Sequence, residues 1–336
     1  SSRNLSPCPL PEMANIQRKR LVSAVLGLVI SAGAIFTLIA IVSPGDLKSA
    51  FSAFNPLYIA PFALTVALMV VCFGYRWHVL LRGAISKPMA VKAMLINMGG
   101  NMVLPARGGD LLRIHFSNAV GNAPVAVVVG AMFTEKAADL LAICLIGTLG
   151  GMVLGLGDAA HRAVIASSAV ICLFVVASLT VVRTKNSLVQ RICLWTFTKM
   201  RRDKFFHEHV SQLIASLGEN LQLCRFARTM AITLVLWLTI HGASYLCIAR
   251  LVGVSLSYPE ALLVLWVSGL GLMIPAAPSG LGVYHATVVS AFYFLGRPIS
   301  EGLVLATALH LSFFVALVVP MGLLYGKWLL KRSLTQ

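Results

Sequence analysis

Long apolar stretches restrict what this sequence can fold into more than any other feature does. A run of about 20 apolar residues is long enough to cross the hydrocarbon core of a bilayer as a helix. Six stretches are of this kind: residues 21–43, 57–74, 125–149, 163–182, 230–251 and 302–325. Only 11% of the 336 residues are charged, whereas a soluble domain usually has about 25%. We therefore expect an all-α polytopic membrane protein with about six transmembrane helices.

The cationic residues predict how these helices are oriented. The chain has 27 Lys and Arg residues against 11 Asp and Glu, which gives a net charge of +16. If the basic N-terminus is cytoplasmic and each stretch crosses once, 22 of the 27 cationic residues fall on the cytoplasmic side, in agreement with the positive-inside rule. We expect both termini in the cytoplasm, at a bacterial-type inner membrane. Because the basic residues lie on membrane loops, we expect no nucleic-acid partner.

The remaining organisation follows from this arrangement. Residues 1–20 form a cytoplasmic tail, 21–328 a single transmembrane domain and 329–336 a second tail. Residues 184–226 are basic and patchily apolar, which is typical of helices lying on an anionic leaflet. The seven cysteines form no CxxC pair and the eight histidines no HExxH pattern. The sequence therefore predicts no metal site and no cofactor.

Two shorter apolar segments, 89–105 and 261–275, predict re-entrant helical hairpins. Both end in Gly- and Pro-rich sequence, and such irregular backbone is tolerated at membrane depth only where protein or a wet cavity shields it. Residues 99–106 (GGNMVLPA) align with 269–276 (GLGLMIPA) at an offset of 170 residues. We expect repeat halves at about 57–150 and 227–325. An odd number of crossings separates them, so the second half would be inverted, as in secondary transporters.

The first polar constellation lies at the tip of the first hairpin, from Asn101 to Arg113. Pro105 ends one half-helix because it lacks an N–H donor. Gly108 and Gly109 are expected to let the chain turn, and Asp110 to cap the next helix. A helix start beside Arg107 and Arg113 is suited to bind an anion. A solvated elbow at the membrane surface is the alternative.

The second constellation, Glu135, Lys136 and Asp139, falls inside the stretch 125–149. Ionised residues within a membrane helix are costly and usually functional. Asp139 can pair with Lys136, and either Arg107 or Arg113 can join the carboxylates. Of these two, we expect Arg107 to be coupled to Glu135, because the first hairpin directly precedes this stretch. A purely structural ion network is the alternative.

The third constellation is the tip of the second hairpin. Pro275, Pro278, Ser279, Gly280 and Gly282 interrupt the helix there, and free backbone N–H groups are expected at the next helix start. A tight apolar turn without function is equally compatible with the pattern. Ser279 with His285 or His310 would suggest an intramembrane hydrolase. However, the G-x-S-x-G pattern of a nucleophile elbow is missing, so this is a remote alternative.

The three constellations together resemble the transmembrane, flippase-like region of the lysylphosphatidylglycerol synthase family, over roughly residues 20–328. Residues 101–113 resemble its N-x-x-x-P-A-R-x-G-[ED]-x-x-R segment, and 135–139 its E-R-x-x-D, with Lys136 in place of Arg. Residues 278–283 (PSGLGV) resemble its P-G-G-L-G-V turn. There Tyr284 and His285 replace the family's basic–acidic pair, so an ion-pair role for this tip is not carried over.

This resemblance implies a lipid flippase rather than an enzyme. Family members that attach an amino acid to phosphatidylglycerol do so with a soluble synthase domain, which this sequence lacks. The expected substrate is an anionic or aminoacylated phospholipid, or a polyprenyl-phosphate-type lipid. Arg107 and Arg113 would hold its phosphate, and Glu135 and Asp139 would balance them when the site is empty. The alternative is a non-transporting scaffold that works with a separate lipid-modifying enzyme; a homo-oligomer is left open.

Overall fold

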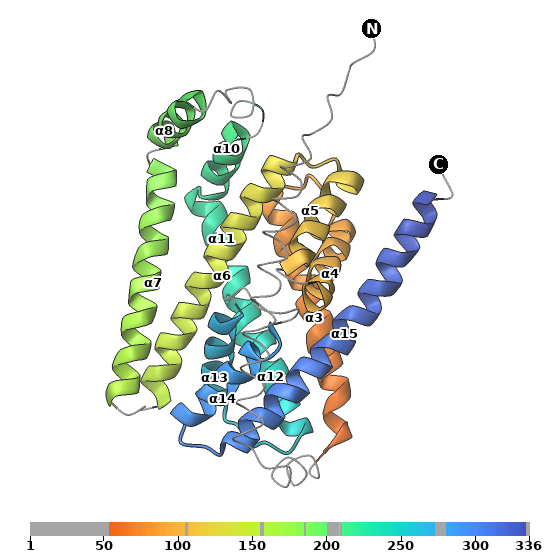
Figure 1. Cartoon of the computed structure of the whole chain (residues 1–336), viewed down its shortest axis with the longest axis vertical. Coiled ribbons are helices and arrows are strands. Elements are labelled where there is room, and N and C mark those ends of the chain that lie inside the picture. Colours follow the sequence, from red (N-terminus) through yellow and green to blue (C-terminus); the bar gives the residue numbers. More distant parts are fainter. Residues whose placement is uncertain are drawn as a thin grey trace, which may run out of the picture.

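The computed structural model describes residues 54–104, 107–154, 158–184, 186–199, 208, 210–272 and 280–333. These residues form a helical bundle without strands, drawn in Figure 1. The expected all-α fold is thereby confirmed. The predicted first span, 21–43, lies outside the described residues.

The helices follow one another in a simple order. They are η1 (Pro56–Tyr58), α3 (Ile59–Leu80), α4 (Lys87–Val103), α5 (Gly108–Gly121), α6 (Val125–Leu154), α7 (Asp158–Thr184), α8 (Asn186–Lys199), α10 (Ser211–Asn220), α11 (Leu223–Val235), the π-helical η4 (Leu236–His241), α12 (Gly242–Leu251), α13 (Tyr258–Gly271), α14 (Val283–Phe294) and α15 (Ile299–Ser333).

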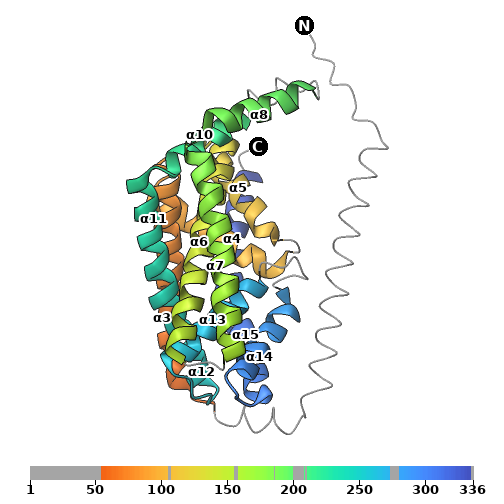
Figure 2. The same ribbon diagram turned by 90° about the vertical axis from the view of Figure 1, so that its left-hand side faces the viewer.

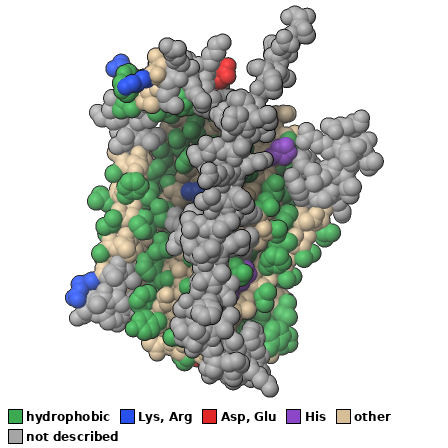
Figure 3. Space-filling view, in the orientation of Figure 1, with side chains coloured by type: hydrophobic (Ala, Val, Ile, Leu, Met, Phe, Trp, Pro, Cys, Tyr) green, Lys and Arg blue, Asp and Glu red, His purple; other side chains and the backbone are tan. Residues whose placement is uncertain are grey.

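Four helical segments of the described chain are long and apolar enough to cross a membrane. They are Pro56–Leu80, Val125–Leu154, Leu223–Leu251 and Ile299–Leu324, and each overlaps one of the predicted stretches. The predicted stretch 163–182 lies in α7, where Ile165–Thr180 is a shorter apolar segment. Large apolar side chains such as Leu68, Phe133 and Leu173 are exposed. Figure 3 shows hydrophobic side chains over much of the described surface of one face. This surface suits lipid better than water.

Two pairs of short helices occupy opposite ends of the bundle. The pair α4–α5 lies in the upper half and the pair α13–α14 in the lower half of both Figure 1 and Figure 2. Of the segments predicted to re-enter the membrane, residues 89–103 lie in α4 and residues 261–271 in α13. The pair α4–α5 packs against α15 where a Cβ on Gly99 would lie 2.8 Å from the carbonyl oxygen of Leu317.

The same turns precede and follow both pairs. A glycine with positive φ ends the long helix before each pair: Gly83 has φ 75° and Gly253 has φ 73°. A second left-handed residue follows each pair: Asn122 has φ 51° and Gly296 has φ 65°. The element order is therefore long helix, two short helices and long helix in both parts of the chain. Glycine and asparagine suit these positions because they adopt left-handed backbone at low cost.

The break between α4 and α5 differs from the prediction in its details. The turn residue is Arg107, at φ 57° and ψ 42°, and it occupies the N-cap of α5. Gly108 and Gly109 lie within α5, and Asp110 lies in its first turn rather than at the cap. Gly109 is needed for close packing: a Cβ there would lie 2.1 Å from the carbonyl oxygen of Asn97 on α4. Arg107 therefore provides the left-handed turn, whereas Gly109 allows the close packing of the two helices.

We expect Gly109→Ala to destabilise the protein by about 1–3 kcal/mol, because the added methyl meets backbone that cannot rotate away. Gly322→Ala is the matched control, because nothing lies within 4 Å of a Cβ at that helical position. That control should be neutral or slightly stabilising. Thermal unfolding of the two variants in detergent tests this, and equal melting temperatures would contradict the tight contact between α4 and α5.

Candidate functional site

A network of charged side chains lies inside the bundle between α3, α5 and α6. Glu135 accepts a hydrogen bond of 2.8 Å from Nη1 of Arg113 and lies 3.6 Å from Nη2 of Arg76. Asp139 accepts two bonds from Arg76, of 2.5 and 3.1 Å, and a third of 3.0 Å from the indole N–H of Trp237. Two arginines therefore neutralise two carboxylates at membrane depth.

The two arginines are fully buried and each packs against an aromatic ring. Arg76 lies over the ring of Phe73, at 4.8 Å, and donates to the hydroxyl of Thr233. Arg113 lies over the ring of Trp77, at 4.1 Å from its centroid. Buried charges are tolerated when they are paired in good geometry. The contacts with rings and hydroxyl fix the guanidinium planes that face the carboxylates.

These pairs correct two expectations from the sequence. The partners of Glu135 are Arg113 and Arg76, whereas Arg107 lies 3.8 Å from Asp110. Asp139 pairs with Arg76, whereas Lys136 lies 4.0 Å from both Asp110 and Glu135. The reason is geometric. Arg107 stands at the start of α5 with its side chain half exposed, whereas Arg113 lies nearly two turns further on, on the buried face.

The sequence reasoning missed Arg76. The apolar stretch that predicts this helix ends at residue 74, whereas α3 continues to Leu80 and carries Arg76 into the core. The available signal was that Tyr75, Arg76 and Trp77 directly follow the apolar stretch, with no Gly or Pro among them to end the helix.

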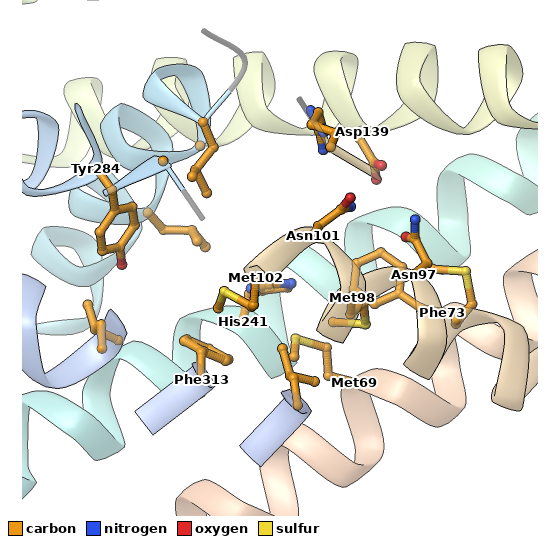
Figure 4. A pocket seen from close by; sticks show the side chains of 18 of the residues that line it. Met69, Phe73, Asn97, Met98, Asn101, Met102, Asp139, His241, Tyr284 and Phe313 are labelled. Carbon is orange, nitrogen blue, oxygen red and sulfur yellow. The ribbon is translucent and has the colours of Figure 1, made fainter. Parts of the chain in front are cut away.

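A cavity of about 500 Å³ lies beside this network, where the two helix pairs approach each other (Figure 4). Its wall is mainly apolar and includes Met69, Met98, Met102 and Phe313. Helices from both parts of the chain contribute to it, from α3, α4 and α6 to η4, α13, α14 and α15. Flexible methionine side chains let such a wall adapt to ligands of different shape.

The cavity brings together six of the nine residues that the sequence predicts to bind substrate. Asn101, Arg107, Glu135, Lys136, Asp139 and Gly280 line it. Asp110 and Arg113 lie behind this wall, where Asp110 accepts a 2.6 Å bond from Asn97 and so ties α5 to α4. Gly280 and Gly282 have φ 68° and 87°, and Gly282 is the N-cap of α14. Pro105, Pro275, Pro278 and Ser279 lie outside the described residues.

The second helix pair contributes neutral polar groups instead of charges. The hydroxyl of Tyr245 lies 2.9 Å from that of Ser268 and 3.0 Å from that of Tyr284. The rings of His285 and His310 lie 5.4 Å apart. In the described residues, no group of three or more His, Cys, Asp or Glu side chains is placed to hold a metal ion.

The charges around the cavity do not balance. The described cluster contains four cations (Arg76, Arg107, Arg113 and Lys136) and three carboxylates (Asp110, Glu135 and Asp139). The two cations that line the cavity, Arg107 and Lys136, make the longest contacts of the cluster, at 3.8 and 4.0 Å. Excess positive charge on loosely engaged side chains favours binding of an anion.

Comparison with known proteins gives this architecture a family context. Residues 24–320 match the family described as the lysylphosphatidylglycerol synthase TM region. A segment of 140 residues, 41% of this chain, is 28% identical to glycosyltransferase AglD of Haloferax volcanii. The chain covers 22% of the length of that relative. The likeness to AglD is therefore partial, whereas the family match covers most of the chain.

Arg113 and Glu135 should be energetically coupled. Removal of one member of a buried pair typically costs about 3–5 kcal/mol, whereas replacement of both by apolar groups can be nearly neutral. We expect Arg113→Met and Glu135→Met each to lower the melting temperature in detergent, and the double variant to recover much of the loss. Arg107→Met is the control and should change stability little, because that side chain is half exposed. Strictly additive losses would contradict the pairing.

Proposed function

Because the chain belongs to the family of the lysylphosphatidylglycerol synthase TM region, we propose that it translocates a phosphate-bearing lipid between the leaflets of the membrane. The observation that carries the proposal is the cavity itself. Its wall is mainly apolar, and two loosely paired cations lie at one side of it. A lipid has the same division, with an anionic phosphate joined to apolar chains.

Arg107 and Lys136 are the groups that would bind the phosphate. Both line the cavity, and both make ion pairs long enough to be exchanged for a bound anion. Arg113, expected from the sequence to share this role, would instead hold Glu135 in place, because its bonds go to that carboxylate and its side chain is fully buried. Glu135 and Asp139 then limit the positive charge when the cavity is empty.

The duplicated element order supports an alternating-access mechanism. The halves α3–α6 and α11–α15 repeat the sequence of long helix, two short helices and long helix, and their short pairs lie at opposite ends of the bundle. In this proposal the two pairs are re-entrant hairpins of an inverted repeat, one reaching into the membrane from each side. Substrate is handled where inverted repeats meet, and elements of both halves line the cavity.

The proposed topology places the α4–α5 end in the cytoplasm together with both termini. In a cysteine-free background, Val153→Cys should then react from outside intact cells with a membrane-impermeant maleimide, and Trp195→Cys should react only after permeabilisation. Both positions are well exposed, at 69% and 66%, so accessibility within the protein does not bias the comparison. Equal labelling of the two from outside would exclude this topology and the inverted repeat with it.

Purified protein in liposomes with fluorescent phospholipid analogues tests the function. We expect flipping faster than in empty liposomes, and a decrease of about tenfold or more in Arg107→Ala and Lys136→Ala. Loss of a charge-assisted hydrogen bond typically costs about 1.5–3 kcal/mol, which is tenfold or more. Lys92→Ala is the matched control, because this exposed lysine on α4 does not line the cavity.

The competing hypothesis is a scaffold that organises enzymes of lipid or envelope-glycan synthesis without moving lipid. It predicts no flipping above the rate of empty liposomes for any headgroup. Equal activity of the Arg107 and Lys136 variants with the wild type would contradict the assignment of the phosphate site, although not lipid transport itself.

A further inference from the structure

The cavity contains a histidine whose hydrogen-bonding capacity is unused. His241 lines the cavity, and Figure 4 shows it near Met102. Both its ring nitrogens are buried and have no hydrogen-bond partner in the described part of the chain. A buried polar atom without a partner costs free energy, so a site of this kind is expected to be completed by a ligand.

The position of the imidazole is fixed by packing. Its ring stacks on Trp237 at 4.7 Å between centroids, with an interplanar angle of 12°, and meets the edge of Phe73. The indole N–H of Trp237 is bonded to Asp139, which anchors the stack to the charged network. Trp237 and His241 both lie in the π-helical segment η4. Such π-helical turns within α-helices are frequent at functional sites. The two ring nitrogens are therefore held in place without using a bond to the protein.

A second unused group lies on α4. The Oδ1 atom of Asn101 is buried without a partner, and Asn101 lines the same cavity. This oxygen can only accept a hydrogen bond, and a neutral imidazole offers one donor and one acceptor. Phosphate oxygens at neutral pH mainly accept, so they leave the acceptor on Asn101 unsatisfied. Hydroxyl groups both donate and accept, so they can bond to the donor and the acceptor of His241 and to the acceptor of Asn101.

A cationic headgroup fits this cavity less well. An ammonium group could donate to Asn101, but it would leave the donor of His241 unused. Each carboxylate of the cluster is already engaged by at least one Arg or Lys, and the described cluster carries one positive charge in excess. An aminoacyl or ethanolamine headgroup would enter a region that repels it.

We infer that His241 and Asn101 form a headgroup subsite that recognises a hydroxyl-bearing group, glycerol or sugar, attached to the phosphate held by Arg107 and Lys136. The inference rests on the proposed function for the phosphate and adds the chemical class of the headgroup. Stacked Trp237 and His241 also provide an aromatic surface beside these hydroxyls, which suits a group of alternating apolar C–H and polar O–H character.

Lipid binding to the purified protein, measured by native mass spectrometry in detergent with each lipid in turn, tests the subsite without requiring transport. The four lipids are phosphatidic acid, phosphatidylglycerol, phosphatidylinositol and phosphatidylethanolamine. We expect phosphatidylglycerol or phosphatidylinositol to bind about tenfold more tightly than phosphatidic acid, as one or two added hydrogen bonds would give. Whichever of the two binds more tightly identifies a glycerol or a cyclic polyol as the preferred group.

Substitutions at His241 separate recognition from packing. His241→Phe retains an aromatic ring to stack on Trp237 but removes both nitrogens, so it should lower the affinity for phosphatidylglycerol and phosphatidylinositol to that for phosphatidic acid. His241→Gln retains a donor and an acceptor without the ring, so it should keep part of the preference. The same His→Phe change at His115, an exposed residue of α5 outside the cavity, is the control and should leave the preference intact.

The outcomes that overturn the inference differ from those that overturn the proposed function. A wild-type protein that binds phosphatidic acid but shows no preference for hydroxyl headgroups would exclude the subsite and leave the phosphate site standing. Equal weakening of all four lipids in His241→Phe would assign the residue to packing alone. If none of the four lipids binds, or if Arg107→Ala and Lys136→Ala bind phosphatidic acid as tightly as the wild type does, the phosphate site itself fails, and the subsite that rests on it fails too.

Discussion

The ion pairs between two buried arginines, the buried Glu135 and the partly buried Asp139 are the constraint on which the rest of the structure depends. Apolar side chains gain little by leaving lipid for a protein interface, so the hydrophobic effect alone does not select how membrane helices pair. An uncompensated charge at the same depth is costly. The buried charges can therefore all be paired in only one register of the helices that carry them, which are α3 with Arg76, α5 with Arg113, and α6 with Glu135 and Asp139. Because α5 is tied to α4 through Asp110 and Asn97, that register also places the tip of the first helix pair and the wall of the cavity.

The two parts of the chain share an order of elements but differ in chemistry. The α4–α5 pair is joined by an amide and a carboxylate and lies among charged groups. The α13–α14 pair lies among the hydroxyls of Tyr245, Ser268 and Tyr284, which are joined by hydrogen bonds within the bundle. A ligand between the pairs thus meets formal charge on one side and neutral polar groups on the other. A symmetric cavity would hold an anion equally well at both sides, whereas this one can orient a molecule whose two ends differ.

Much of this arrangement could be predicted from the sequence, because it follows from patterns along one helix. The long apolar helices, the shorter apolar helices that contain residues 89–103 and 261–271, and the polar residues Asn101, Lys136 and Asp139 are of this kind. The partners of the charges could not be predicted, because they depend on which face of α5 meets α6. Sequence proximity favoured Arg107 for Glu135, whereas the buried face carries Arg113. His241 belongs to no motif. That its two ring nitrogens lack a hydrogen-bond partner in the described chain follows only from the positions of its neighbours in the fold.

The four cations differ in burial and in the length of their ion pairs, and this difference explains how an anion could bind without unfolding the protein. Arg76 and Arg113 make hydrogen bonds of 2.5 to 3.1 Å to carboxylates and are fully buried, so their loss would leave charges unpaired in the core. Arg107 and Lys136 lie at 3.8 and 4.0 Å from theirs and keep part of their side chains exposed. Partly exposed pairs at such distances contribute little to stability, so exchange of these carboxylates for a phosphate changes the free energy of folding only slightly. Arg107 also holds a left-handed backbone conformation at the break between α4 and α5, which is uncommon for a residue with a side chain. The same break that interrupts the helix therefore presents the cation to the cavity, so a ligand bound to Arg107 would act directly on the junction between the two short helices.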